Sequence, residues 1–126
     1  MAGTASTGSA GGSSTFDPAS TVRVDVVVPG AQLRLAGRLS AATVADVRLA
    51  LREAVDGGID DLLIDIGEIE LVDATGLGML VATHRRALRA GRRMVLADVP
   101  VRIERLLIVT RLNRVLHCLP RQRAVV

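Results

Sequence analysis

Hydrophobic residues first alternate with polar ones along this 126-residue chain and then recur at helical spacing. Every second residue from 22 to 28 is a valine, which predicts a strand with one buried face. The dipeptide Pro29-Gly30 is typical of a turn, and Leu33 and Leu35 then resume the alternation. Two such strands joined by a tight turn predict a hairpin.

Apolar residues at helical spacing predict three helices beyond the hairpin. We expect the first to have Ser40 as its N-cap and to end at Gly57-Gly58, where a left-handed cap costs least. The second follows Asp73 and ends at Gly91, and the third has Pro100 in its first turn. The predicted inner faces comprise Val44, Val47, Leu51, Ala54 and Val55, then Leu77, Leu80, Val81, His84 and Leu88, and finally Ile103, Leu106, Leu107 and Thr110.

Short apolar runs between these helices predict the remaining strands. Residues 62–66 predict a central strand that is buried on both faces, with residues 67–72 carrying the chain away from it. Residues 94–97 predict another strand, and residues 115–119 a last one. The order β-β-α-β-α-β-α-β predicts an α/β fold, a mixed sheet opened by a hairpin with helices packed on it.

Composition divides the chain into one domain and two tails. Residues 1–20 are rich in Gly, Ser, Thr and Ala and almost uncharged, which predicts a disordered tail. Residues 21–120 carry the periodic pattern, and residues 121–126 form a short C-terminal tail. The chain shows no signal-peptide pattern, and no apolar run approaches the roughly 18 residues of a membrane span. We therefore expect a cytoplasmic protein.

Several kinds of site are disfavoured by the residues present. The chain has no Trp or Tyr and one Phe, so stacking on nucleic-acid bases is essentially unavailable. Cys118 is the only cysteine, and the pair His117-Cys118 is too small for a metal site. No serine elbow, phosphate-binding loop or paired metal carboxylates appear. We expect no enzyme activity and no cofactor.

Charge is distributed unevenly along the chain. Residues 1–84 carry five Arg and eleven acidic residues, a net charge of −6, and residues 85–126 carry eleven Arg and two acidic residues, a net charge of +9. Such asymmetry can indicate binding to nucleic acid or to an anionic membrane. The arginines are dispersed over several predicted elements, which favours solvated helix faces instead. We expect neither nucleic acid nor membrane as a partner.

A loop enters the second predicted helix through Asp73, Ala74, Thr75, Gly76, Leu77 and Gly78. Asp73 can cap the helix by accepting a backbone N–H, a structural role that does not exclude a functional one. Thr75 lies in the first turn, where a partner can reach its hydroxyl, and Gly76 and Gly78 leave room for another backbone. A phosphate on Thr75 would add about −1.5 to −2 charges and repel a surface fitted to a neutral threonine. We predict that these six residues form a partner-binding surface.

Five segments of the chain match the pattern of a known family: Gly37-Arg38-Leu39, the strand 62–66, residues 73–78, Gly91 and residues 112–115. Over about residues 22–119 the chain resembles the STAS domains of bacterial anti-sigma factor antagonists. In that family the residue before the first Gly of the helix-start motif is phosphorylated, which in this chain is Thr75. The resemblance implies a domain that binds an anti-sigma factor serine/threonine kinase, releases a sigma factor, and is switched off by phosphorylation. ATP and magnesium would belong to the partner.

Three features depart from the family pattern. Ala74 replaces the first of two small hydroxyl residues, Thr75 stands where Ser is commoner, and the usual C-terminal helix is missing or cut short. The departures at Ala74 and Thr75 motivate an alternative, a constitutive STAS scaffold subunit of a stress-signalling or lipid-transport complex. A third hypothesis, electrostatic binding by the Arg-rich second half, ranks last.

Overall fold

A computed structural model describes residues 21–120 of the chain, so the two predicted tails lie outside the described residues. The helices and strands follow the predicted order. They are β1 (Val22–Val28), β2 (Gln32–Leu39), α1 (Val44–Asp56), β3 (Leu62–Val72), α2 (Ala74–Arg89), β4 (Met94–Val99), α3 (Val101–Val109), a short 3-10 helix (Leu112–Arg114) and β5 (His117–Pro120).

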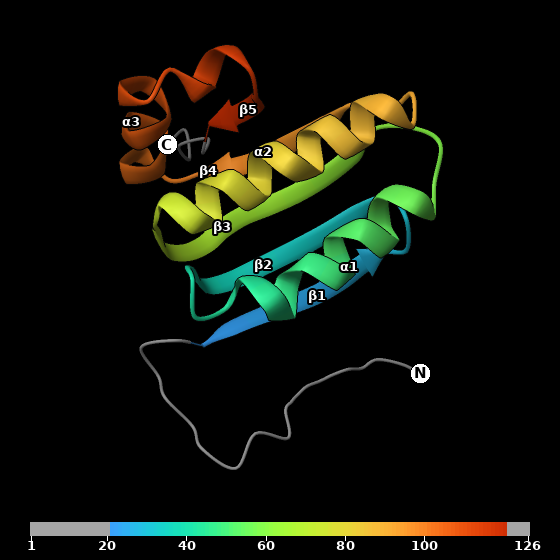
Figure 1. Ribbon diagram of the computed structural model, residues 1–126, viewed down its shortest axis with the longest axis horizontal. Helices are drawn as coiled ribbons and strands as arrows, with labels where there is room; N and C mark the ends of the chain where they lie inside the picture. The colour runs from blue at the N-terminus through green and yellow to red at the C-terminus, as the bar shows by residue number, and fades with distance from the viewer. Residues whose placement is uncertain (1–20, 121–126) are drawn as a thin grey trace, which may run out of the picture.

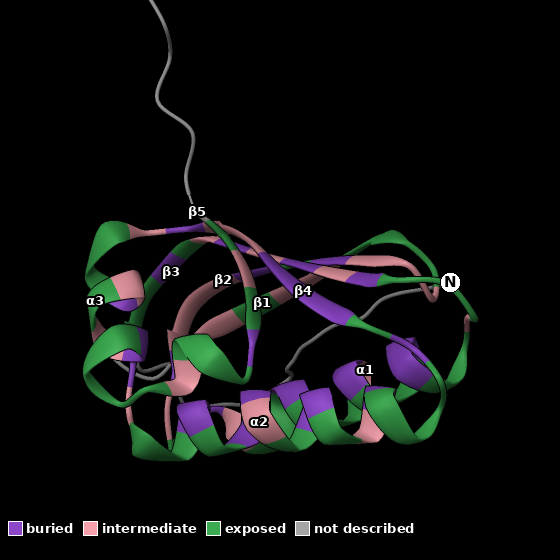
Figure 2. Cartoon of the chain, turned by 90° about the horizontal axis from the view of Figure 1, so that it is seen from above, coloured by how far each residue is buried: buried purple, intermediate pink, exposed green. Residues whose placement is uncertain are grey.

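The five strands form one mixed sheet in the order β1-β2-β3-β4-β5. β1 and β2 form the predicted antiparallel hairpin, in which Val22 pairs with Gly37 and Val26 with Leu33. All later neighbours, from β2 to β5, are parallel. The helices α1 and α2 lie side by side over one face of the sheet, and α3 lies beyond the end of β4 (Figures 1 and 2). The prediction of an α/β fold with a hairpin-opened mixed sheet is confirmed.

The aliphatic core lies between the sheet and the pair α1 and α2. In β3 the side chains of Leu62, Ile64 and Ile66 are fully buried, whereas Leu63 and Asp65 between them are partly exposed. The prediction of a strand buried on both faces is therefore wrong, because α1 and α2 cover only one face. On the other face Asp65 forms an ion pair with Arg34 at 3.6 Å. Residues 67–72 are not an exit loop either, since β3 continues along β2 to Val72.

Other predicted core positions lie at the margins of the structure. Val26 is 58% exposed, because β1 is an edge strand whose pairing with β2 shifts register between Val26 and Val28. Leu88 is 54% exposed, since the buried stripe of α2 is centred on Leu80, Thr83 and Ala87. Thr110 is also exposed. The spacing of hydrophobic residues located these strands and helices but not the centre of each buried face.

The start of α1 differs from the prediction. Thr43, not Ser40, occupies the N-cap position, and it makes no side-chain cap hydrogen bond. Its fully buried hydroxyl instead donates to the carbonyl of Arg38 at 2.6 Å, which folds residues 40–43 into a turn before the helix. The helix ends at Gly57 as predicted, but with φ −93° there, so the cap is not left-handed.

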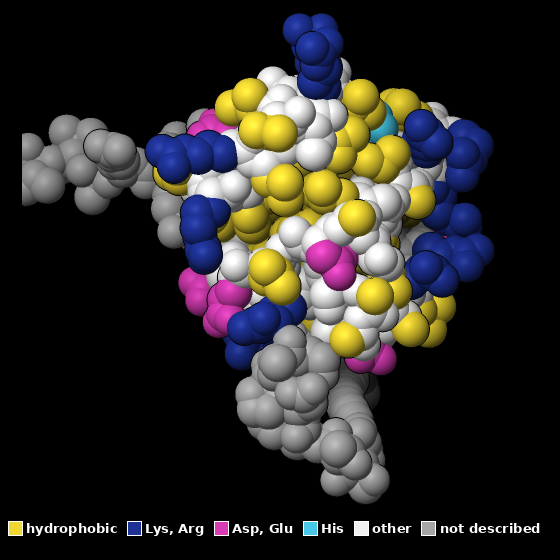
Figure 3. All heavy atoms as spheres, turned by 60° about the vertical axis from the view of Figure 1, so that its left-hand side comes forward, with side chains coloured by type: hydrophobic (Ala, Val, Ile, Leu, Met, Phe, Trp, Pro, Cys, Tyr) yellow, Lys and Arg dark blue, Asp and Glu magenta, His cyan; other side chains and the backbone are white. Residues whose placement is uncertain are grey.

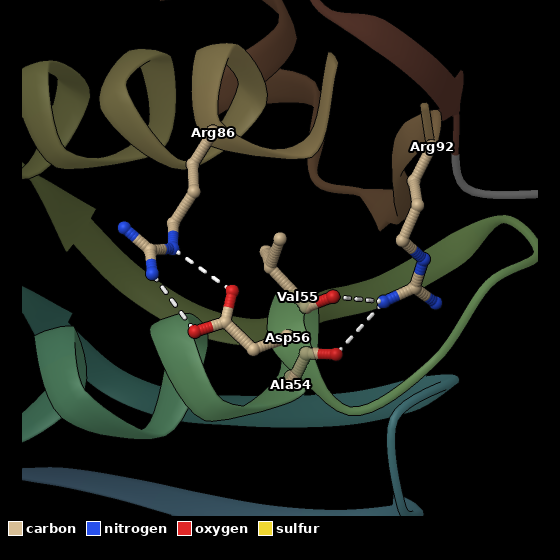
Figure 4. Close-up of polar contacts among 5 residues, drawn as sticks. All are labelled: Ala54, Val55, Asp56, Arg86 and Arg92. Atoms are coloured by element: carbon tan, nitrogen blue, oxygen red, sulfur yellow. Dashed lines mark hydrogen bonds and ion pairs between the residues drawn. The ribbon is translucent and has the colours of Figure 1, made fainter. Parts of the chain in front are cut away.

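The guanidinium of Arg92 is buried and joins three segments of the chain. It donates to the carbonyls of Ala54 and Val55 at the C-terminal end of α1, both at 2.8 Å (Figure 4). It also donates to the carbonyls of Gly30 at 2.5 Å and Asp60 at 2.6 Å. A helix C-terminus carries partial negative charge, which stabilises a cation placed there. The burial of Arg92 could not be predicted from the sequence, because nothing local distinguishes it from the exposed arginines.

We expect Arg92→Met to lower the free energy of unfolding by about 3 kcal/mol or more, because four carbonyls lose their donor in a largely buried site. Urea denaturation measures the difference. Arg93→Met is the matched control, since Arg93 pairs with Asp61 at the exposed surface and should change stability by about 1 kcal/mol or less. Equal losses in the two variants would contradict the structural role of Arg92.

His84 lies on the buried side of α2, near the core as predicted. Its ring packs edge-on against that of His117, with 6.2 Å between centroids, and its Nδ1 has no hydrogen-bond partner among the described residues. Burial lowers the pKa of His84, and positive charge on His117 and Arg85 lowers it further. The folded state therefore holds His84 neutral more firmly than the unfolded state does.

This pKa difference predicts that acid destabilises the fold. The unfolded chain gains a proton at His84 near pH 6.5, while the folded chain resists it, so the free energy of unfolding falls as the pH drops below about 6.5. Denaturation at pH 7 and pH 5 should show a smaller difference in His84→Leu than in the wild type. An identical difference in both proteins would assign the effect to other groups.

Candidate functional site

Three helices begin at the same end of the sheet. β2, β3 and β4 run parallel and each leads into a helix, so the N-terminal ends of α1, α2 and α3 gather where these strands end (Figure 1). The connection from β3 to α2 is Asp73 alone. In open α/β sheets, ligands bind preferentially beyond the carboxyl ends of the strands. This end is therefore the first candidate for a functional surface.

Asp73 holds the start of α2 in place. Its Oδ1 accepts the N–H of Gly76 at 2.9 Å, and its Oδ2 accepts the N–H of Ala41 at 3.1 Å, from the turn before α1. The N–H of Asp73 donates to the carbonyl of Leu39 at 3.1 Å. Donation from Gly76, and to a lesser extent from Ala41, holds the pKa of Asp73 below its usual value despite partial desolvation. The predicted cap is confirmed, and the same carboxylate joins two loops.

The six residues of the predicted surface divide into exposed and buried members. Ala74, Thr75 and Gly78 are exposed, and the Thr75 hydroxyl makes no hydrogen bond to another described residue. Gly76 and Leu77 are buried. Of the six predicted residues, Asp73, which is partly exposed, and the three exposed residues therefore offer a partner the most accessible surface.

The two glycines of the motif have different structural roles. A Cβ added to Gly76 would collide with the carbonyl oxygen of Leu39, so the first turn of α2 can contact the end of β2 only with glycine there. A Cβ added to Gly78 would meet no atom within 4 Å. The expectation that both glycines leave room for a partner therefore holds only for Gly78.

A groove of about 480 Å³ runs along α2 from Thr75 towards its C-terminal end, with α1 as its other wall. Four arginines line it: Arg48 and Arg52 from α1, and Arg86 and Arg89 from α2. The sequence analysis did not identify this group. Spacings of three and four residues could have placed each pair on one helix face, but only the tertiary structure shows that the two faces meet.

Exposed hydrophobic residues lie near the same end of the sheet. Leu71 is the second-to-last residue of β3, and Val101 is the first residue of α3. Ile108, seven residues after Val101, shares its face of α3 and is also exposed. On the side of the molecule that carries α3, hydrophobic side chains gather in the middle and arginines lie around the margin (Figure 3). Such patches are typical of protein-binding surfaces.

The basic second half of the chain is partly neutralised within the fold. Arg86 pairs with Asp56 at 2.8 Å (Figure 4), Arg93 pairs with Asp61 at 2.6 Å, and Arg92 is buried. Within residues 21–120, no group of three or more His, Cys, Asp or Glu side chains is arranged to hold a metal ion. In the same residues, no helix is both long and apolar enough to cross a membrane.

Alanine substitutions at Gly76 and Gly78 test whether the fold requires glycine at each position of the α2 start. Gly76→Ala should lower the free energy of unfolding by about 2 kcal/mol, because the new methyl group meets backbone. Gly78→Ala should raise it by about 1 kcal/mol, because alanine is the better helix former in open space. Thermal and urea unfolding of both variants measure this. A destabilised Gly78→Ala would mean that the space around Gly78 is already used within the fold.

Comparison with known proteins agrees with this geometry. A family model described as "Mlab, STAS domain" matches residues 20–120. Among solved structures, an anti-sigma factor antagonist from Mycobacterium paratuberculosis is 19% identical, with a TM-score of 0.71 over 80% of this chain and 87% of that one. An anti-sigma-factor antagonist (STAS) domain protein from Planctomyces limnophilus is 17% identical, with a TM-score of 0.63 over 80% and 91% of the two chains. The anti-sigma factor antagonist SpoIIAA in its unphosphorylated form is 15% identical, with a TM-score of 0.58 over 83% and 90%. The solved structures share the fold, and the family match over most of the chain shows that this protein belongs to the STAS domain family.

Proposed function

We propose that this chain is a protein-binding domain that antagonises an anti-sigma factor kinase, and that phosphorylation of Thr75 switches it off. The observation that carries the proposal is the exposed Thr75 near Gly78. The fold does not require glycine at position 78, because an added Cβ would meet no atom within 4 Å. Three proteins of this fold are described as anti-sigma factor antagonists, one of them in its unphosphorylated form.

Gly78 links the helix start to binding. A glycine inside a helix costs about 1 kcal/mol relative to alanine, and in α2 no contact within the domain requires it. We therefore assign the open space beside Thr75 to contact with a partner protein. A partner backbone can approach α2 closely at this point and contact the threonine hydroxyl.

Phosphorylation at this position would change binding without unfolding the helix. The N-terminal end of a helix carries partial positive charge and tolerates a phosphate. At an interface fitted to a neutral threonine, the added charge would be desolvated beside the carboxylate of Asp73 and would oppose binding. The chain supplies the acceptor hydroxyl and the contact surface, and the partner supplies the nucleotide, so the domain itself is not an enzyme.

A second function is favoured by the exposed apolar residues. Leu71, Val101 and Ile108 suit a permanent interface, because obligate interfaces are more hydrophobic than transient ones. Together with Ala74 in the motif, they support a constitutive scaffold subunit of a stress-signalling or lipid-transport complex.

Incubation with ATP and candidate anti-sigma factor kinases tests the switch. We expect mass spectrometry to place one phosphate on Thr75, and Thr75→Glu to weaken binding of the kinase by about 100-fold, because the charge is desolvated at the interface. Thr75→Ser should keep both properties, and Thr75→Ala should bind the kinase but accept no phosphate.

Two results would contradict this scheme. If no phosphate appears on Thr75 and Thr75→Glu binds as the wild type does, the switch is wrong. If the domain binds none of the kinases but forms a stable, ATP-independent complex with one other subunit, the scaffold function replaces it. Gly78→Ala helps to separate structure from binding, since it should bind less tightly while being more stable.

A further inference from the structure

The arginines of the groove between α1 and α2 are largely unpaired. Among residues 21–120, the only ion pair in the groove is that of Arg86 with Asp56. Arg48, Arg52 and Arg89 are exposed and form neither an ion pair nor a hydrogen bond with any described side chain. These three arginines therefore line the groove without a direct ionic partner among the described residues, although the carboxylate of Asp56 attracts Arg52 at longer range.

Of the three acidic residues of α1, Asp56 pairs with the groove residue Arg86 and also attracts Arg52, whereas the other two lie away from the groove. Asp46 and Glu53 are seven residues apart and share one face of the helix, whereas Arg48 and Arg52 share another. At 100° per residue these two faces differ by more than a quarter turn. The groove therefore keeps a net positive charge, because four arginines line it and, among the described residues, only the carboxylate of Asp56 pairs with one of them.

Between its arginines the groove is lined mainly by small and apolar residues of α2. Gly78 and Ala82 are small residues in the groove, next to the nearly buried side chains of Met79 and Thr83. A methionine thioether adapts its shape to an apolar side chain placed over it. From Thr75 to Arg89 the α2 wall is roughly 21 Å long, at 1.5 Å per residue.

We infer that this arginine-lined groove binds an acidic segment of the partner protein, in continuity with Thr75. The carboxylates of the segment would pair with Arg48, Arg52 and Arg89, and an apolar side chain would lie over Gly78 and Ala82. The inference rests on the proposed function, because it extends the contact surface around Thr75 along α2.

A protein segment fits the groove better than nucleic acid. The groove lining combines arginines with small and apolar residues of α2, which suits mixed acidic and apolar side chains rather than a continuous phosphate backbone. Residues 21–120 contain no Phe, Tyr or Trp on which a base could stack. Asp56 and the far face of α1 would also repel phosphates along a longer strand.

The test uses the full chain and two labelled peptides of equal length. One is a helix-forming peptide of Glu and Leu, and in its twin every Glu is replaced by Lys. Fluorescence anisotropy should show binding of the Glu peptide only, weakened by salt. The double variant Arg48→Glu/Arg52→Glu should lower the affinity about tenfold or more. NMR shifts should change at the amides of Gly78 and Ala82.

The matched control is Arg102→Glu/Arg105→Glu, which makes the same charge change on exposed residues of α3 outside the groove. It should bind the Glu peptide as the wild type does, and unfolding measurements should show both double variants folded. Failure of the Glu peptide to bind, or an equal loss in both variants, would overturn the inference. Tighter binding of duplex DNA or of anionic phosphatidylglycerol vesicles through Arg48 and Arg52 would also overturn it.

This experiment separates the inference from the proposed function. The peptide assay needs neither a kinase nor a phosphate, so it can succeed when the switch at Thr75 fails. If a kinase binds the wild type and Arg48→Glu/Arg52→Glu equally well, the groove inference is wrong while the antagonist function remains. If the kinase responds to Thr75→Glu and to the groove variant, both are supported.

Discussion

The buried guanidinium of Arg92 is the interaction on which the arrangement of the other elements depends. It satisfies carbonyls from the end of α1, from the β1–β2 turn and from the segment before β3. No carboxylate among the described residues pairs with it, so the partial charges of oriented carbonyls, including those of a helix C-terminus, must stabilise the cation. Glycine is needed around it, because a Cβ on Gly58 would collide with the carbonyl oxygen of Gly30.

The hydrogen bonds of Arg92 also determine the shape of the surface that we assign to binding. Arg92 lies three residues after the end of α2, so its contacts hold the end of α1 next to the end of α2. The ion pair of Arg86 with Asp56 joins the same two helices at the surface (Figure 4). With these ends joined, α1 and α2 run side by side, and the groove between them leads to Thr75 at the opposite end of α2.

At the Thr75 end the geometry depends on backbone contacts rather than on side-chain packing. Asp73 binds two N–H groups from different loops, and Gly76 allows the helix to touch the end of β2. Thr75 is therefore presented on a rigid helix start, while Gly78 beside it leaves open space. A binding surface of this kind is preorganised and loses little conformational freedom when a partner arrives.

Local sequence alone predicted the features that depend on neighbours in the chain. These are the hairpin, the order of strands and helices, and the cap at Asp73, because turn chemistry, periodicity and capping act over a few residues. Only the tertiary structure decided that β3 continues to Val72, that one sheet face is left uncovered, and that Arg92 is buried while Arg93 is exposed. The tertiary structure alone also decided the groove lined by Arg48, Arg52, Arg86 and Arg89. Its residues are far apart in sequence, and only the packing of two helices on one sheet face brings them together.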